Sequence, residues 1–184
     1  NEYQRADTAP RTTLGDGALN SSDVVQARRY VSGLDPFTNA GGPAVAAADP
    51  GLRGVIGGSL FGAKVEGQSL LRLVSGKGGA VVVELVSGSE VAAVSFRLRY
   101  DAAKLGKPVV SLGDLPEGSV LTVNDTVEGE LTILIDSGEP FGGVGNPISL
   151  IEILFASGAA DCLVELHGEA SLADGYGHDV AVYQ

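Results

Sequence analysis

The chain has 184 residues, of which 44% are hydrophobic, and it carries 27 glycines, 8 prolines and a net charge of −11 at pH 7. The hydrophobic content is sufficient for a folded core, and the excess of acidic residues disfavours binding to the phosphates of nucleic acids. No apolar run approaches the roughly 18 residues of a membrane-spanning helix, so no membrane span is predicted.

Residues 1–34 are expected to contain one short helix. Ser22 or Asp23 is expected to cap it, because a side-chain oxygen can accept the free backbone N–H groups of a first turn. Gly33 is expected to end the helix, and Pro36 prevents its return. The apolar residues between these limits recur at spacings of three and four and are expected to share one face. They are Val24, Ala27, Tyr30, Val31 and Leu34.

Residues 15–23, just before that helix, have the pattern of a calcium loop. Such loops place oxygens on alternate residues, a glycine at the bend and an acidic residue at the start of the next helix. Asp16, Gly17 and Asp23 fit the second half of the pattern, and Asp7 could supply the carboxylate that the first half lacks. The predicted ligands of a calcium ion, the one cofactor expected, are Asp7, Asp16, Ala18 and Asp23. The alternative is a capped helix after a turn, without a metal.

The remainder of the chain divides into a linker and a region of β-strands. Residues 35–58 are rich in glycine, proline and alanine, a composition typical of linkers. From residue 59 onward, short apolar segments alternate with turn residues, and within 91–100 apolar and polar residues alternate one by one. The expected strands are Leu70–Val74, Ala80–Val86, Val91–Tyr100, Val109–Leu112, Val120–Val123, Leu131–Ile135, Ser149–Phe155, Leu163–Leu166 and Val180–Tyr183.

This pattern predicts a mainly β fold, a jelly-roll sandwich of about nine strands preceded by one short calcium-loop helix segment. Three regions are expected. Residues 1–34 hold the loop and helix, residues 35–58 are the linker, and residues 59–184 form the sandwich.

Residues 12–34 resemble a single dockerin repeat. The resemblance is carried by Asp16-Gly17, Leu19-Asn20, Ser21-Ser22-Asp23, Arg28-Arg29-Tyr30 and Gly33-Leu34. In dockerins the small hydroxyl residues before the helix and the basic pair within it contact the partner. The resemblance therefore implies that Ser21, Ser22, Arg28 and Arg29 bind a partner, with ordinary helix surface as the alternative. Dockerins normally have two repeats, so this single one would be completed by an upstream piece, by another chain or by the β-domain itself.

Residues 69–183 look like a cohesin domain, the partner fold of dockerins, or like the related carbohydrate-binding sandwiches. The main resemblance is the strand Val91–Tyr100 followed by Asp101 and then by Lys104-Leu105. Further matches are Gly129–Ile135, Leu150–Phe155 and Ala173-Asp174-Gly175. The resemblance implies a cohesin-like sandwich that offers a sheet face to a protein partner.

The two resemblances together imply a non-enzymatic scaffolding protein outside the cell or on its surface, which binds copies of itself. The helical segment of one copy would dock on the β-domain of the next, and such a contact can build a filament. The alternative is a carbohydrate-binding module of a secreted hydrolase complex, with a polysaccharide as its ligand. Tyr3, Tyr176 and Tyr183 are candidate sugar platforms, although tryptophan is absent and only 5% of residues are aromatic.

Several other features have plain explanations. The scattered carboxylates and the two histidines, His167 and His178, form no pattern that assigns acid and base roles, so no catalytic residue is predicted. The segment from Asp174 to Asp179 could bind a cation but has the composition of a hairpin turn.

Cys162 lies in an apolar stretch and is expected to be a buried small hydrophobe. Asn20 and Asn124 begin triplets of the N-glycosylation type, which arise often by chance, and Asn124 at an expected turn is the better candidate.

Overall fold

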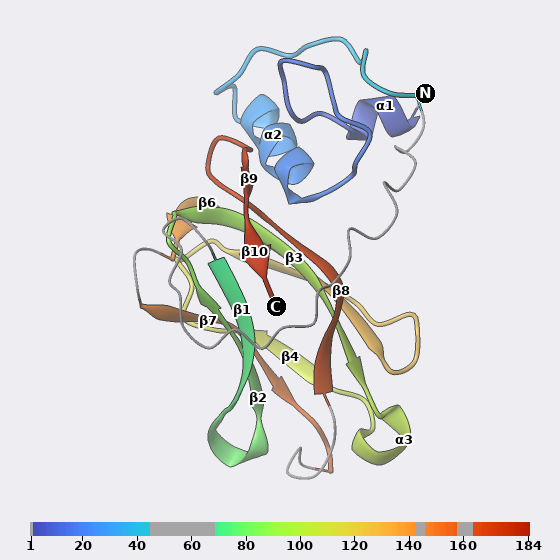
Figure 1. Ribbon diagram of the computed structural model, residues 1–184, viewed down its shortest axis with the longest axis vertical. Coiled ribbons are helices and arrows are strands. Elements are labelled where there is room, and N and C mark those ends of the chain that lie inside the picture. Colours follow the sequence, from blue (N-terminus) through green and yellow to red (C-terminus); the bar gives the residue numbers. More distant parts are fainter. Residues whose placement is uncertain (1, 45–68, 143–145, 158–163) are drawn as a thin grey trace.

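The structure is a computed structural model that describes residues 2–44, 69–142, 146–157 and 164–184. These residues form an N-terminal lobe, residues 2–44, and a β-sandwich that contains all the others. Figure 1 shows the lobe resting on one end of the sandwich, next to strand β9. Within the described residues, no helix combines the length and the apolar character needed to cross a membrane.

The sandwich consists of two five-stranded sheets. The first sheet has the strand order β10-β1-β2-β7-β4, and the second has the order β5-β6-β3-β8-β9. Paired strands are antiparallel except for β1 and β10, which run parallel. The strands are β1 Ser69–Ser75, β2 Val81–Val86, β3 Val91–Tyr100, β4 Val109–Leu112, β5 Val120–Asn124, β6 Glu130–Phe141, β7 Pro147–Leu154, β8 Val164–Ala173, β9 Asp179–Val180 and β10 Val182–Tyr183. The predicted mainly β, two-sheet sandwich is confirmed.

The core lies between the two sheets and follows from the alternation of side chains along each strand. Successive residues of a strand point to opposite faces. Val94, Phe96 and Leu98 of β3 are therefore buried in the core, whereas Ser95 and Arg97 lie on the outer face of the second sheet. Most core residues are aliphatic, and those of the two sheets that are fully buried include Leu71, Leu85, Ile133, Ile135, Leu150, Ile151 and Ile153.

In its described residues, each segment predicted as a strand overlaps at least one observed strand. The predicted bounds of β3 and β4 agree with the structure, while β6 and β8 continue beyond the predicted segments. The last predicted segment, Val180–Tyr183, divides into β9 and β10, which belong to different sheets. Two short helical elements, η1 (Lys77–Gly79) and α3 (Ala102–Leu105), lie in connections between strands.

The helix of the lobe, α2, spans Ser21–Val31, and its N-cap is Asn20. The Asn20 side chain accepts the backbone N–H of Ser22, and the Asp23 carboxylate accepts the backbone N–H of Asn20, which together make a capping box. The predicted cap at Ser22 or Asp23 is therefore wrong, because Asn20 reaches the free N–H groups first. Gly33 follows the helix with a φ of 70°, as expected for a residue that ends a helix.

The apolar residues that were predicted to share one face of α2 are not the residues that pack most closely. Val31 and Leu34 are 84% and 67% exposed, although Tyr30 is buried. The residues of α2 that are buried include Ser21, Ser22 and Val25. The helix thus packs with a mostly polar face, which a search for apolar periodicity does not detect.

The rest of the lobe wraps around α2. A short helix that the sequence did not predict, α1 (Glu2–Ala6), opens the chain. Residues 35–44, predicted as the start of the linker, belong to the lobe and pack against its helices. The Gln4 side chain donates to the Gly42 carbonyl, and the Tyr30 and Thr38 hydroxyls are 2.8 Å apart. The remainder of the predicted linker, residues 45–58, lies outside the described residues, as do residues 59–68 and Cys162.

Candidate docking interface

Helix α2 lies on the outer face of the second sheet of the sandwich. It contacts β3, β8 and β6. Figure 1 shows α2 lying above the ends of these strands, next to the turn between β8 and β9. The described part of the chain therefore contains an interface between its helical segment and its own β-domain.

Small side chains on the sheet allow the helix to approach closely. Ala93 of β3 pairs with Ala173 of β8, and both are buried with Val25 of α2 in a small apolar cluster. Ser95 and Ser171 are the next outward-facing pair on the same two strands, with their hydroxyls 3.2 Å apart. A large side chain at any of these positions would hold the helix away from the sheet.

The first turn of α2 is held to β8 and β9 by serine hydroxyls. The Ser21 hydroxyl lies 3.0 Å from the Ser171 hydroxyl, and the Ser22 hydroxyl donates to the Asp179 carboxylate in a short hydrogen bond. Gly177, in the turn before β9, has a φ of 82°, and a Cβ there would meet the Ser22 carbonyl at 3.4 Å. The Asn20 cap fixes the start of the helix and so aims both serines at the sandwich.

Arg28 connects the last turn of α2 to β6. Its guanidinium lies 2.5 Å from the Asp136 carboxylate and also donates to the Ser137 carbonyl. Both side chains of the ion pair are only 25% and 21% exposed. Burial raises the pKa of Asp136, and the Arg28 guanidinium opposes that shift. The pair therefore adds a partly buried charge contact to the interface.

Arg29 extends the contact to the turn between β8 and β9. It donates to the Gly175 carbonyl at 3.1 Å, and its guanidinium carbon lies 5.4 Å from the centre of the Tyr176 ring. Asp35, in the lobe, accepts hydrogen bonds from Arg29 and Gln26, and these bonds lower the pKa of Asp35 to about 2. Asp35 thus orients the guanidinium that reaches the sandwich.

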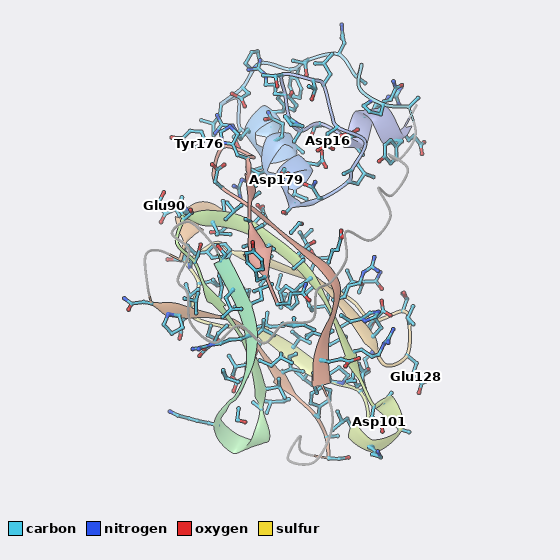
Figure 2. The ribbon with its side chains drawn as sticks, in the orientation of Figure 1. Asp16, Glu90, Asp101, Glu128, Tyr176 and Asp179 are labelled. Carbon is cyan, nitrogen blue, oxygen red and sulfur yellow. The ribbon has the colours of Figure 1, made fainter. Side chains whose placement is uncertain are left out.

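A cavity of about 710 Å³ opens beside this end of the interface. Arg28 and Arg29 line it from the helix, and Tyr176 and Asp179 line it from the sandwich. Figure 2 shows Tyr176 and Asp179 between the lobe and the sandwich, with Glu90 below them. The Tyr176 side chain is 69% exposed.

The four residues predicted to bind a partner, Ser21, Ser22, Arg28 and Arg29, all contact the β-domain of the same chain. Whether they also bind another molecule stays a prediction. The sequence did not identify the residues on the sheet side, of which Asp136, Ser171 and Asp179 make the polar contacts. One signal was available: the outward residues of β3 change from Ala93 and Ser95 to two arginines where the helix no longer covers the sheet.

Three of the four predicted calcium ligands, Asp7, Asp16 and Ala18, precede α2, and Asp23 lies in its first turn. Asp7 and Asp23 are buried, and their carboxylates accept hydrogen bonds from backbone N–H groups. The Asp16 side chain accepts the backbone N–H of Ala18. In the part of the chain that the structure describes, no three acidic, histidine or cysteine side chains come together as metal ligands would.

Calcium takes six to eight oxygen ligands. Both Asp7 oxygens and one Asp23 oxygen accept a single backbone N–H, so each of them keeps a second lone pair. Calcium binding therefore stays a prediction of the sequence alone, and no step of the proposed function is assigned to it.

The remaining predicted sites have simple surroundings. The Asn20 side-chain oxygen caps α2 by accepting the Ser22 N–H. Asn124 is exposed at the end of β5, where its side-chain oxygen accepts the backbone N–H and the hydroxyl of Thr126.

The segment from Asp174 to Asp179 forms a turn, in which the Asp174 carboxylate accepts the backbone N–H groups of Tyr176 and His178. Burial would raise the pKa of Asp174, but these N–H groups and His178 lower it.

The sequence matches no protein-family profile and no curated protein. Among solved structures, similar ones are cohesin modules. A non-cellulosomal cohesin from the archaeon Archaeoglobus fulgidus is 18% identical with a TM-score of 0.49, over 62% of this chain and 84% of that one. A chain of a type I cohesin–dockerin complex from Clostridium thermocellum is 13% identical with a TM-score of 0.48, over 62% and 94%. The resemblance of residues 12–34 to a dockerin repeat stays a prediction.

Proposed function

We propose that this protein is a non-catalytic docking protein that connects copies of itself outside the cell. Its lobe would bind the second sheet of a neighbouring copy through the same contacts that it makes in its own chain. The observation that supports this proposal is the seating of α2 on β3, β8 and β6 through Ser21, Ser22, Arg28 and Arg29. These are the residues that the resemblance to dockerins assigns to partner binding.

The chemistry of the contact favours exchange between copies. Besides Val25, three alanines and the Tyr176 ring, the contacts described above are made by hydroxyls, carboxylates, guanidinium groups and backbone carbonyls. Groups of this kind are hydrated when they separate, so leaving the sheet exposes little apolar surface. A lobe that detaches from its own sandwich therefore remains soluble until it binds the sandwich of another copy.

The chain between the two partners is long enough for such an exchange. The 24 residues 45–68 connect the lobe to β1. At roughly 3.4 Å per residue, a chain of this length can reach up to about 80 Å. A lobe seated on the next copy leaves its own sandwich open to a third copy. Such a head-to-tail contact produces a filament unless its rotation closes a ring.

A cysteine-pairing experiment tests the proposal directly. In a Cys162→Ser background, one chain carries Ser21→Cys and a second chain carries Ser171→Cys, at positions whose hydroxyls are 3.0 Å apart. The two chains are mixed, unfolded and refolded together at high concentration, then oxidised. We expect a disulfide-linked dimer that joins positions 21 and 171, identified by peptide mass spectrometry.

The matched control replaces Ser21→Cys by Ser32→Cys, at the other end of α2 and about 16 Å away along the helix axis. That mixture should give far less cross-linked dimer. A chain that carries both Ser21→Cys and Ser171→Cys reports the contact within one molecule. The proposal is wrong if this double variant closes its internal disulfide while the mixed single variants stay monomeric at every concentration.

One observation favours the alternative of a carbohydrate-binding module. The exposed Tyr176 ring borders the cavity of about 710 Å³, and sugar rings stack on such aromatic faces. However, the Arg29 guanidinium already lies against that ring. Retention on insoluble polysaccharides that Tyr176→Ala abolishes and Tyr183→Ala leaves intact would support this second function.

A further inference from the structure

The outer face of the first sheet, β10-β1-β2-β7-β4, carries mostly apolar side chains. Leu70 of β1 and its strand partners Val86 and Tyr183 form one row across this face, and Val74 and Val82 form a second row. Leu70 is 41% exposed and Tyr183 is 53% exposed. The three valines are partly exposed and lie outside the core cluster between the two sheets.

The apolar surface continues to the opposite edge of this sheet. Leu154 of β7 pairs with Val109 of β4, and the two residues are 46% and 67% exposed. A sheet with one face in water normally directs polar side chains outward, as β3 of the second sheet does with Ser95, Arg97 and Arg99. The first sheet departs from this rule, and exposed apolar surface of this kind marks an interaction site.

The charges on this face nearly cancel. In its five strands, all of which lie within the described residues, the charged residues are Arg72, Glu84 and Glu152. Arg72 of β1 and Glu84 of β2 are strand partners and form an ion pair of 2.7 Å. Two copies of a chain with a net charge of −11 repel each other, and a nearly neutral face is where this repulsion opposes contact least.

A second copy of the chain matches this face in size and in charge. With strands about 4.8 Å apart and a rise of about 3.4 Å per residue, the sheet presents roughly 500 Å². Two such faces together bury about 1,000 Å², which is the lower limit for a specific interface between proteins. In a two-fold contact every pairing occurs twice, so Arg72 of each copy can face Glu84 or Glu152 of the other.

We propose that the outer face of the first sheet binds the same face of a second copy, with a two-fold axis between them. Helix α2 contacts β3, β8 and β6, which belong to the second sheet. The two contacts therefore use opposite sides of the sandwich and do not compete. This inference does not depend on the proposed exchange of lobes, because pairing through the first sheet requires no movement of the lobe.

Sedimentation velocity of the full chain over a wide range of concentrations tests the inference, and we expect a weak dimer. Leu70→Lys and Leu154→Lys should each raise its dissociation constant at least about tenfold, because every dimer would then bury two unpaired ammonium groups. Leu34→Lys makes the same change at a residue of the lobe that is 67% exposed, and it should leave the dissociation constant unchanged. Equal effects of the three substitutions in folded chains would overturn the inference, and Leu154→Lys decides the question if Leu70→Lys does not fold.

A chain with a locked lobe separates this contact from the exchange of lobes. Ser21→Cys and Ser171→Cys in one Cys162→Ser chain close an internal disulfide that holds α2 on its own sheet. The locked chain should form the same dimer, and Leu70→Lys should still dissociate it. A dimer that disappears on locking would contradict the inference. So would a wild type that stays monomeric at every concentration, and a lower free energy of unfolding for Leu70→Lys would then show that the face is covered within its own chain.

Discussion

At the scale of single residues, the interface depends on charged groups that support one another. Asp35 accepts hydrogen bonds within the lobe from Gln26 and Arg29, and the Arg29 guanidinium in turn reaches the sandwich. The pKa of Asp35, about 2 against an ordinary value of 3.8, shows that the folded lobe favours the ionised form. The contribution of Asp35 to stability therefore depends on pH.

The change Asp35→Asn should destabilise the lobe in a pH-dependent way. Because the folded-state pKa is depressed, the stabilisation is complete above about pH 4 and is lost as the pH falls through about 2. We expect the difference in urea midpoint between wild type and Asp35→Asn to be constant from pH 7 to pH 4 and to shrink below that. The same change at exposed Asp114 should give a difference near zero throughout.

Arg28→Ala should weaken the seating of α2 by about 1 kcal/mol, since partly exposed ion pairs contribute little more than this. The measurement is the exchange rate of the α2 amides, which should rise a few-fold while the β3 amides stay protected. Arg97→Ala, on the same sheet beyond the helix, is the control. If Arg28→Ala and Asp136→Ala destabilise additively in a double-mutant cycle, the ion pair does not contribute to the seating.

At the scale of elements, the position of α2 depends on the small residues beneath it. Ala93→Leu should push the helix away from the sheet, because the added side chain points outward from β3 into the space that Val25 occupies. Overpacking of this kind costs about 1–3 kcal/mol. We expect limited proteolysis to cleave the lobe while the sandwich stays resistant.

Ala103→Leu, the same change at an exposed position in α3, serves as the control and should leave the protease pattern unchanged. If Ala93→Leu also leaves the lobe resistant, α2 is not held by this contact. If the sandwich itself becomes sensitive, Ala93 acts through the core rather than at its surface.

The strands could be predicted from the sequence much better than the helix contact. Val94, Phe96 and Leu98 alternate with polar residues, and this local pattern is sufficient to place β3 and its buried face. The part of α2 that meets the sheet contains Ser21 and Ser22, which apolar periodicity does not mark. Their partners lie about 150 residues away in the chain, and no local periodicity carries information over that separation.

The loop before α2 also shows what cannot be predicted from the sequence, although the residues involved are close together in the chain. The sequence predicts Asp7, Asp16 and Asp23 as calcium ligands, and the structure shows all three accepting backbone N–H groups. The sequence could not show what they accept, since an N–H of the backbone occurs at nearly every residue and leaves no trace in the residue types. The three-dimensional structure brings Asp23 to the N–H groups of Thr8 and Ala9.

At the scale of the whole molecule, the sandwich is the stable part on which the lobe rests. Phe96 is 1% exposed at the centre of its core. Phe96→Ala should therefore cost about 3–5 kcal/mol, measured by urea unfolding followed by circular dichroism. Phe37→Ala makes the same change at a residue that is 77% exposed in the lobe and contacts the Tyr30 ring. It should cost no more than about 1 kcal/mol, and equal costs would contradict the observed core.

The placement of both docking partners in one chain also determines when copies would join. A lobe on its own sheet and a lobe on a neighbour's sheet make the same contacts, so the strength of those contacts cancels from the balance between the two. What remains is a competition between the tether, which supplies the lobe at an effective concentration of about a millimolar, and the real concentration of other copies. At low concentration the chains would remain monomers, and chains concentrated on one surface would associate, without any change in the protein.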